Sequence, residues 1–538
     1  MKKHLSALLG ILMIVAAVSA CGRAGGATSA PAFTVGGVVS GSTGTVVLQN
    51  NGGNDLPVAT NGPFSYPAAA GSPYHITVLT NPIGQTCIVT NGTGTVILTS
   101  VTNVAVDCFT RGGLDTFFNA PKGFTVQSNT AGGNADDTGN AILLDAKDRI
   151  VVAGKSANSA GNSDMAIWRF NTDGSLDTTF NNSGFVVHNS AAGGNSDDAA
   201  SAIAIDLHGR IVVVGTSRNI AGNTDLVIWR LSSDGAIDAS FGANGIVVHN
   251  SAAGGNADDT GRAVTVDSLD RILVAGSSRN SAGNTDMVIW RFNPNGTFDT
   301  TFEGEGFVVH NSAAGGNGDD AGSAIALDAQ GRILVAGSST NSAGNTDMTL
   351  WRFNANGTLD TTLNSSGIVV HNNASGGNAD DAGNAVTLDS QGRIIVTGTS
   401  RNSAGNTDMV IWRINADGIF DVNFNGNGIV FNNGAAGSNG DDSGNAVTID
   451  SEGRIVLTGT SRNIPGNTDM VIWRYNPDGI IDTTFGADGI VVHNGAAGGN
   501  GDDGGNAVII NAQQRILVTG SSRNSPGDSD MVLWRFFP

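Results

Sequence analysis

Pairs of adjacent aspartates recur seven times in this chain, at intervals of 61 residues. They are Asp136-Asp137, Asp197-Asp198, Asp258-Asp259, Asp319-Asp320, Asp380-Asp381, Asp441-Asp442 and Asp502-Asp503. In five units an arginine follows 21 residues after the pair: Arg218, Arg279, Arg401, Arg462 and Arg523. Carboxylates in such a pattern can accept backbone N–H groups, pair with arginines or bind calcium. These residues form the candidate binding face of the protein.

Two roles for the aspartates stay open. In the first, which we favour, the carboxylates accept loop N–H groups and pair with arginines of their own or the next unit, so that they hold the units together. In the second, Asp and Asn oxygens bind calcium, which needs six to eight oxygen ligands. The segment 498–502 echoes a calcium-binding nonapeptide, but it recurs every 61 residues rather than every nine. We therefore expect no cofactor, no resident metal and only slight calcium dependence.

No catalytic residues are predicted, because catalysis needs one asymmetric constellation and the seven units are nearly identical. His188, His249, His310, His371 and His493 lie one to a unit and cannot converge on one metal. Departures from the repeat, such as Arg262 and His208, are scattered as sequence drift would leave them. Glu303 and Glu305 flank one glycine, and a glycosidase pair there is a disfavoured alternative.

The elements that must position these residues follow from the same period. Seven tryptophans, each followed by arginine, stand 61 residues apart: Trp168, Trp229, Trp290, Trp351, Trp412, Trp473 and Trp534. One to a unit, they are expected in the core between units rather than as a sugar-stacking platform. The third unit predicts strands at 245–249, 263–267, 271–276 and 286–292, with 256–259 at the end of a long loop.

Four short strands per unit favour an all-β ring of blades. A glycine-led strand near Phe124 comes before the first complete unit, and the chain stops after the strand at Trp534. Pairing of these two segments would complete the last blade and leave no open sheet edge. The sequence thus predicts a seven-bladed β-propeller with four strands per blade, in which the aspartate and arginine segments share one face around a central channel.

Two motifs carry a resemblance to a known family. Hairpin strands such as 331–337, which begin Gly-Arg-Ile, and the Asp-Gly-x-x-Asp-Thr-Thr-Phe turn at 478–485 resemble the bacterial delta-60 repeat family. The resemblance covers about four fifths of the chain. It implies a propeller and an exported location, and it brings no activity with it.

The N-terminal residues predict export and lipid anchoring. Lys2 and Lys3 precede a short apolar run, so residues 1–20 are predicted to be a signal peptide. The run ends in Val-Ser-Ala-Cys, which resembles a bacterial lipobox and makes Cys21 the candidate lipidated residue; ordinary cleavage with Cys21 incidental is the alternative. Residues 21–31 read as a flexible tether that lifts the folded part off the lipid.

Residues 32–110 are expected to form a small antiparallel β-sandwich, and residues 111–538 the propeller. Strands are predicted at 45–48, 74–79, 87–89, 95–98 and 104–106. Cys87 and Cys108 are the cysteines left after lipidation, and in an oxidising compartment they should form a disulfide. The turns of this region resemble an immunoglobulin-like or transthyretin-like domain of secreted bacterial lipoproteins, typical of spacers and adhesion modules.

The formal net charge of -20 argues against nucleic acid and anionic lipid headgroups as partners. The function that these observations favour is that of a non-catalytic, monomeric lipoprotein of the outer membrane or cell surface. It would bind a protein or a neutral glycan, or act as a rigid scaffold. The alternative is an extracellular polysaccharide hydrolase or lyase, which should show one deep asymmetric pocket on the channel axis instead of a shallow seven-fold face.

Overall fold

The computed structural model describes residues 33–538, so the predicted signal peptide and Cys21 lie outside the described residues. The described chain divides into two compact units. One contains the residues up to Thr80 together with Cys87–Asp107, and the other contains Asn81–Thr86 together with Cys108–Pro538. Within the described part every regular element is a strand except a short 3-10 helix, η1 (Phe180–Asn182). No helix there has the length and apolar character needed to cross a membrane.

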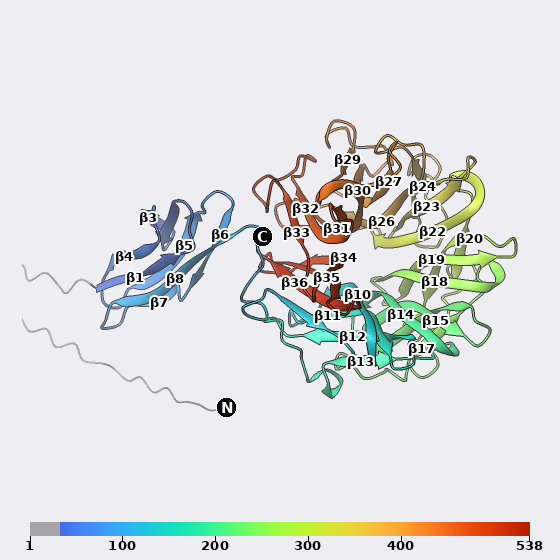
Figure 1. Ribbon diagram of the computed structural model, residues 1–538, viewed down its shortest axis with the longest axis horizontal. Helices are drawn as coiled ribbons and strands as arrows, with labels where there is room; N and C mark the ends of the chain where they lie inside the picture. The colour runs from blue at the N-terminus through green and yellow to red at the C-terminus, as the bar shows by residue number, and fades with distance from the viewer. Residues whose placement is uncertain (1–32) are drawn as a thin grey trace, which may run out of the picture. The chain divides into compact units, whose positions relative to one another are not determined.

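The N-terminal strands form two four-stranded sheets (Figure 1). The first has the order β4-β1-β8-β6 and comprises β1 (Phe33–Ser40), β4 (Gly62–Ala68), β6 (Gln85–Thr90) and β8 (Val101–Thr110). The second has the order β3-β2-β5-β7 and comprises β2 (Val46–Asn50), β3 (Gly53–Val58), β5 (Pro73–Thr80) and β7 (Thr93–Thr95). The predicted disulfide between Cys87 and Cys108 is confirmed, and it joins the neighbouring strands β6 and β8.

Two expectations for this region are wrong. The strand expected at 95–98 ends at Thr95, and Ile97 and Leu98 that follow it are exposed rather than half-buried on a sheet. The sheets are not purely antiparallel either, because β1 runs parallel to β8. The strand β1 was not predicted, because Gly36 and Gly37 in its middle have low strand propensity. They are needed there because a Cβ at Gly37 would lie 1.6 Å from the carbonyl oxygen of Val104.

The remaining strands form seven four-stranded sheets around a common centre, which we call repeat sheets 1 to 7 in chain order (Figure 1). The first strands, nearest the centre, are β10 (Gly132–Leu144), β14 (Gly193–Ile205), β18 (Gly254–Val266), β22 (Gly315–Leu327), β26 (Asp381–Leu388), β30 (Gly437–Ile449) and β34 (Gly498–Ile510). The second strands are β11 (Ile150–Asn158), β15 (Ile211–Asn219), β19 (Ile272–Asn280), β23 (Ile333–Asn341), β27 (Ile394–Arg401), β31 (Ile455–Asn463) and β35 (Ile516–Asn524).

The third strands carry the tryptophans and are β12 (Ser163–Phe170), β16 (Thr224–Leu231), β20 (Thr285–Phe292), β24 (Thr346–Phe353), β28 (Thr407–Ile414), β32 (Thr468–Tyr475) and β36 (Ser529–Phe536). The fourth strands are β13 (Phe185–His188), β17 (Ile246–His249), β21 (Phe307–His310), β25 (Ile368–His371), β29 (Ile429–Asn432) and β33 (Ile490–His493). Repeat sheet 7 takes its fourth strand from the start of the repeat region: β9 (Phe124–Gln127) pairs with β36, and Phe124 lies opposite Trp534.

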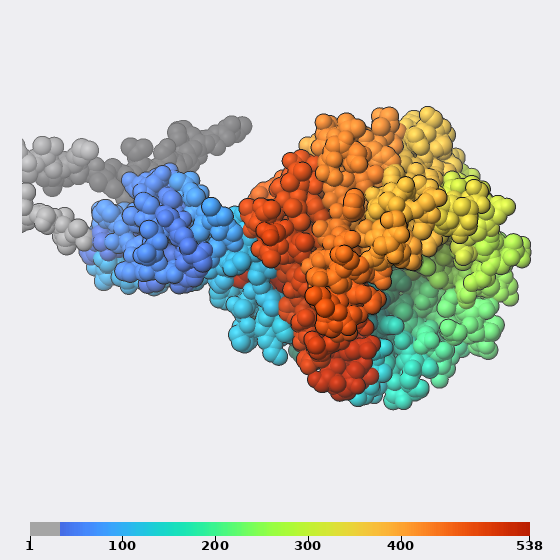
Figure 2. All heavy atoms as spheres, turned by 45° about the horizontal axis from the view of Figure 1, so that its top comes forward, coloured from blue at the N-terminus to red at the C-terminus, as the bar shows by residue number. Residues whose placement is uncertain are grey.

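The core lies between the repeat sheets, in seven apolar clusters that each join two neighbours. Met165 and Ile167 of sheet 1, for example, pack in one cluster with Trp229 of sheet 2. All seven tryptophans are fully buried, as expected for core residues. Another cluster joins Trp168 of sheet 1 to Leu533 of sheet 7. The last repeat, in red, accordingly borders the first, in cyan (Figure 2).

Near the centre the sheets approach closely because the first strands carry small residues. A Cβ at Gly261 would lie 2.4 Å from side-chain carbons of Val214 and Leu226 in the preceding sheet. The loop expected to end at Asp259 is instead strand in six of the seven sheets, where the first strand begins at or near the Gly-Gly step. Its pairing is irregular, with Gly254 opposite Asn280 but Asp259 opposite Ser278. A segment without β-branched residues gives no strand signal in sequence.

Candidate functional site

The first aspartate of each pair bonds to the preceding repeat sheet. In sheet 3, Asp258 Oδ1 accepts the backbone N–H of Thr224 of sheet 2 at 3.0 Å. The six equivalent bonds run from Ser529 to Asp136 (2.8 Å), Ser163 to Asp197 (3.0 Å), Thr285 to Asp319 (2.8 Å), Thr346 to Asp380 (3.1 Å), Thr407 to Asp441 (3.0 Å) and Thr468 to Asp502 (2.9 Å). The bond to Asp136 joins sheet 7 to sheet 1.

The second aspartate of each pair is buried, because adjacent residues of a strand point to opposite faces. The seven residues, each at most 2 % exposed, are Asp137, Asp198, Asp259, Asp320, Asp381, Asp442 and Asp503. Oδ2 of each accepts the backbone N–H of the residue eight positions earlier, at 2.6 to 2.7 Å. These seven carboxylates therefore fix the turn before the first strand and are not available on the surface.

The buried aspartates are electrostatically unusual. Oδ1 of all seven has no hydrogen-bond partner within the described residues. Burial raises the pKa of each, and that of Asp137, Asp381, Asp442 and Asp503 to about 6. A carboxylate of the preceding sheet, such as Asp347 beside Asp381, raises the pKa further, whereas the facing serine hydroxyl, such as that of Ser400, lowers it. The ionised form is thus disfavoured inside the protein.

The arginines lie at the same end of the repeat sheets as the aspartates, as expected. Three are within ion-pair distance of the first aspartate of their own sheet: Arg279 and Asp258 at 3.7 Å, Arg401 and Asp380 at 3.8 Å, Arg462 and Asp441 at 3.5 Å. Within the described part of the chain Arg218 and Arg523 form no such pair. Each paired side chain is 41 to 56 % exposed, so these ion pairs contribute little to stability.

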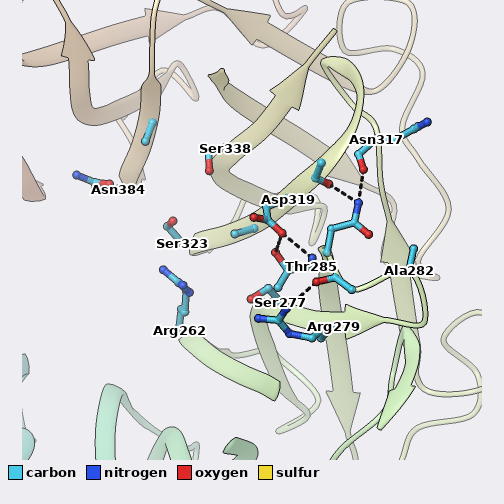
Figure 3. Close-up of a pocket in the computed structure, with 15 residues that line it drawn as sticks. Arg262, Ser277, Arg279, Ala282, Thr285, Asn317, Asp319, Ser323, Ser338 and Asn384 are labelled. Atoms are coloured by element: carbon cyan, nitrogen blue, oxygen red, sulfur yellow. Dashed lines mark hydrogen bonds between the residues drawn. The ribbon is translucent and has the colours of Figure 1, made fainter. Parts of the chain in front are cut away.

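A cavity of about 800 Å³ opens at this end, across repeat sheets 3, 4 and 5 (Figure 3). Its wall includes Arg262, Ser323 and Asn384, which occupy equivalent positions on three successive first strands. Arg279 and Asp319 also line it. The cavity therefore breaks the seven-fold symmetry. Arg262 lies in this wall, and no other unit has a charged residue at the equivalent position. From the sequence alone, this residue was interpreted as drift.

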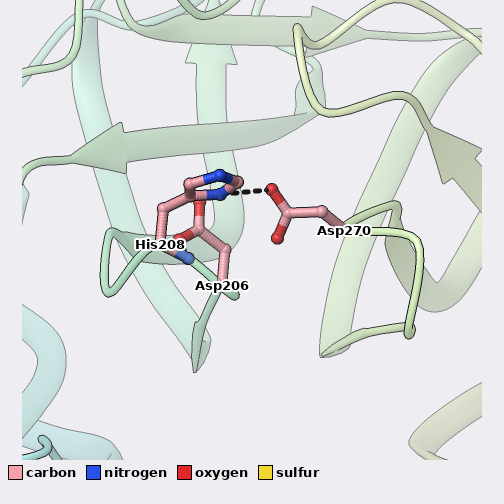
Figure 4. A group of neighbouring side chains, drawn as sticks. All are labelled: Asp206, His208 and Asp270. Atoms are coloured by element: carbon pink, nitrogen blue, oxygen red, sulfur yellow. Dashed lines mark hydrogen bonds and ion pairs between the residues drawn. The ribbon is translucent and has the colours of Figure 1, made fainter. Parts of the chain in front are cut away.

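A second cluster lies at the opposite end, in the turns that join the first and second strands. Asp206, His208 and Asp270 place one ligand atom each within 4.8 Å of one another (Figure 4), and they are the one such group of metal-ligating residue types among residues 33–538. Asp270 Oδ2 lies 3.0 Å from His208 Nδ1 and 3.2 Å from Arg210 Nη2, and Arg210 Nε lies 2.5 Å from Asp206. The Arg210 guanidinium pairs with both carboxylates, so the cluster is an ion-pair network that links sheets 2 and 3.

The repeated histidines lie beside the tryptophans of the next sheet and do not converge. His310 Nδ1, for example, accepts the indole N–H of Trp351 at 3.3 Å. Burial lowers the pKa of each of the five, to about 4 for His249 and His493, so these rings are neutral. Their role is to cover the tryptophan edge.

Glu303 and Glu305 line a groove of about 630 Å³ with the apolar residues Phe307, Phe353 and Leu359. The groove lies at the end of the sheets opposite the aspartates, since it follows the C-terminal end of β20. It is the second place where residues particular to one unit come together.

Six segments of the chain match one family model, described as a domain of unknown function (DUF5122) beta-propeller: residues 148–180, 209–241, 270–302, 330–363, 390–424 and 451–485. These six segments are similar to the β-propeller repeats that this family model describes. Each match covers the second and third strands and the turn that follows them, which are the segments that carry the resemblance noted in the sequence. A comparison with curated proteins finds no match.

Several solved structures are similar at low identity. A protein of unknown function from Dyadobacter fermentans DSM 18053 is 12% identical over 77% of this chain and 97% of its own, with a TM-score of 0.37. An ulvan lyase is 10% identical over 75% and 94%, with a TM-score of 0.39, and a glucose dehydrogenase 11% identical over 62% and 95%, with a TM-score of 0.35. At these values no activity is transferred to this chain.

Proposed function

We propose that this protein is a non-catalytic binding or scaffold lipoprotein of the bacterial cell envelope. In this proposal Cys21 carries the lipid at the outer membrane or cell surface, residues 32–110 form a sandwich-like spacer, and residues 111–538 form a closed seven-bladed propeller. The propeller binds a protein or glycan partner at the end that carries the aspartates and arginines, and the protein acts as a monomer.

Three contacts between repeat sheets 1 and 7 support closure of the ring. They are the pairing of β9 with β36, the shared cluster of Trp168 and Leu533, and the hydrogen bond from Ser529 to Asp136. The N–H of Arg535 donates to the carbonyl oxygen of Gly123, so the alternation of an antiparallel pair directs the N–H of Thr125 toward β36. Thr125→Pro would remove this donor from β9 and should lower the melting temperature of the repeat region and promote dimers through the exposed edge of β36. The matched control is Val491→Pro, at the equivalent position of β33. If the ring is closed, both should destabilise alike; a T125P protein as stable as the wild type would contradict closure.

The observation that favours binding over catalysis is the use of the carboxylates. All seven first aspartates accept an N–H group of the neighbouring sheet, and all seven second aspartates are buried. The asymmetric cavity is of the kind that we expected of an enzyme, yet Asp319 is the one carboxylate in its wall and no histidine lines it. Hydrolysis of a glycosidic bond by acid–base chemistry needs two carboxyl groups.

The test is a screen of the full-length protein against glycans and envelope proteins, in which binding and product release are measured together. Saturable binding without new sugar ends is expected. Release of oligosaccharides by the pure protein would overturn the proposal. Anchoring is tested separately by mass spectrometry of the N-terminus, where Cys21→Ser should abolish the lipid adduct and release the protein from the membrane fraction.

A second candidate, a polysaccharide hydrolase or lyase, rests on the two glutamates that line one groove. If the screen detects cleavage, Glu303→Gln and Glu305→Gln should each abolish it, and Glu452→Gln, an exposed glutamate in sheet 6, should not. Cleavage that survives both substitutions would reject this groove as its site.

A further inference from the structure

The cavity at repeat sheets 3 to 5 contains a cation that has no partner in the protein. Arg262 forms no hydrogen bond and no ion pair with any residue in the range 33–538. The surrounding protein lowers the pKa of its guanidinium, and no carboxylate offsets this effect. By contrast, Arg291 in the same sheet is paired with Asp299 at 2.8 Å. The Arg262 side chain is exposed to the cavity, so a ligand can reach its guanidinium. A guanidinium that has no counter-ion and lies in a concave wall is an attractive site for an anion.

The equivalent positions in the other sheets show that the arginine is not needed for assembly. Four of them are asparagines, Asn140, Asn384, Asn445 and Asn506, whose Nδ2 atoms donate to a backbone carbonyl oxygen of the next sheet at 2.8 to 3.0 Å. The other two are Ser201 and Ser323. Arg262 therefore replaces a hydrogen bond between sheets with a free guanidinium that faces the cavity (Figure 3).

The rest of the wall fits a polyhydroxylated ligand. Ser323 and Ser338 offer hydroxyl groups, and Asn384, whose Nδ2 donates to the next sheet, offers its Oδ1. A volume of about 800 Å³ is within the range of small-molecule sites and accommodates a short saccharide. The planar guanidinium matches a carboxylate with two parallel hydrogen bonds.

The charge of the site limits the ligand to few negative groups. Asp319 shares the cavity, the second arginine of its wall, Arg279, is paired with Asp258, and the chain as a whole has a formal charge of -20. Dianionic phosphate and polyanions would be repelled more strongly than a single carboxylate. We propose that this cavity binds a saccharide through one uronic acid residue, whose carboxylate pairs with Arg262 and whose hydroxyl groups contact the serines and Asn384. The inference deepens the proposed binding function and rests on it.

The test compares D-glucuronate, D-glucose and inorganic phosphate by titration calorimetry with the full-length protein. Wild type should bind glucuronate at least about tenfold more tightly than glucose, the size of effect expected for a charge-assisted pair, and more tightly than phosphate. Binding should weaken as salt increases. Arg262→Asn restores the residue of four other sheets, so it should fold normally and lose the preference for glucuronate.

Two further variants sharpen the result. Lys147→Asn removes an exposed cation from the turn between β10 and β11, at the opposite end of the repeat sheets, and should bind as wild type does. Asn445→Arg places the cation at the equivalent position of sheet 6 and should add a second glucuronate site. Equal affinity of wild type and R262N for glucuronate, or tighter binding of phosphate than of glucuronate, would overturn the inference. If the glycan screen finds a neutral ligand that R262N binds as well as wild type, the inference fails while the proposed binding function stands.

Discussion

Asp381→Asn should stabilise the protein at pH 8 and leave its stability nearly unchanged at pH 4. Asp381 is fully buried, its Oδ1 has no hydrogen-bond partner among residues 33–538, and burial raises its pKa from 3.8 to about 6. The folded protein therefore holds a proton between about pH 4 and pH 6 that the unfolded chain releases. The contribution of this group to stability is greatest below the unfolded pKa and is lost as pH rises through about 6.

The size of the effect follows from the shift. About two pKa units correspond to about 3 kcal/mol of cost for holding the ionised form at pH 8. Asparagine removes that cost and still accepts the N–H of Asn373, which Asp381 Oδ2 accepts at 2.7 Å. The shift already includes the bond from the N–H of Asn373 to the ionised carboxylate, so this bond is not subtracted again. The gain at pH 8 should be at most about 3 kcal/mol.

The assay is chemical denaturation of wild type and variant at pH 8 and pH 4. The same Asp→Asn substitution is then made at the equivalent positions of neighbouring sheets. Asp442 and Asp503 share the raised pKa of about 6, so the triple Asn variant should gain roughly three times as much. The control is Asp380→Asn, since that side chain is 56 % exposed and should show little pH dependence. A D381N protein that is less stable than wild type at pH 8 would refute the reasoning. So would a change in the free energy of unfolding that is the same at both pH values.

Three further predictions concern the contacts that hold the fold together. Arg352→Met should cost about 2 to 3 kcal/mol in chemical denaturation, because buried Asp360, paired with Arg352 at 2.7 Å, would keep only the less buried Arg332 at 3.1 Å; a loss below 1 kcal/mol would mean that the pair is dispensable. Cys87→Ser should lower the stability of the N-terminal sheets by about 3 kcal/mol, and the protease sensitivity of that region measures this loss. A reducing agent should leave the stability of the repeat region unchanged. Millimolar calcium should move the melting temperature by no more than a few degrees relative to a chelator, since the first aspartates already accept N–H groups; an increase of tens of degrees would favour calcium ligation instead.

Much of the repeat architecture could be predicted from sequence because the repeat makes each signal visible seven times. The strands at 245–249, 271–276 and 286–292 fall within or beside β17, β19 and β20. The segment at 256–259 was expected in a loop because Gly, Asn, Ala and Asp have low strand propensity. It is strand in the structure because the neighbouring strand and the preceding sheet supply its hydrogen bonds, which are contacts that local sequence does not encode.

The site was predicted less completely. The sequence placed the aspartates and arginines at one end, and the structure brings Asp258 and Arg279 together. It did not separate the two members of each pair, although the alternation of side chains along a strand predicts that one faces inward. Arg262 was interpreted as drift because the departures from the repeat are scattered over different units. Ser338 and Asn384, which line the same cavity, lie in other repeat sheets.

The repeats themselves argue that recognition depends on departures from the repeat. The contacts that recur between all neighbouring sheets, such as the bond from Thr224 to Asp258, use groups that occur in every unit, so those groups are occupied in every unit. Whatever remains free to bind a ligand must be a residue released from that pattern. Arg262 is such a residue, because it replaces an asparagine that elsewhere bonds to the next sheet. In a protein built this way, substitutions that restore the consensus residue should weaken binding while they preserve the fold.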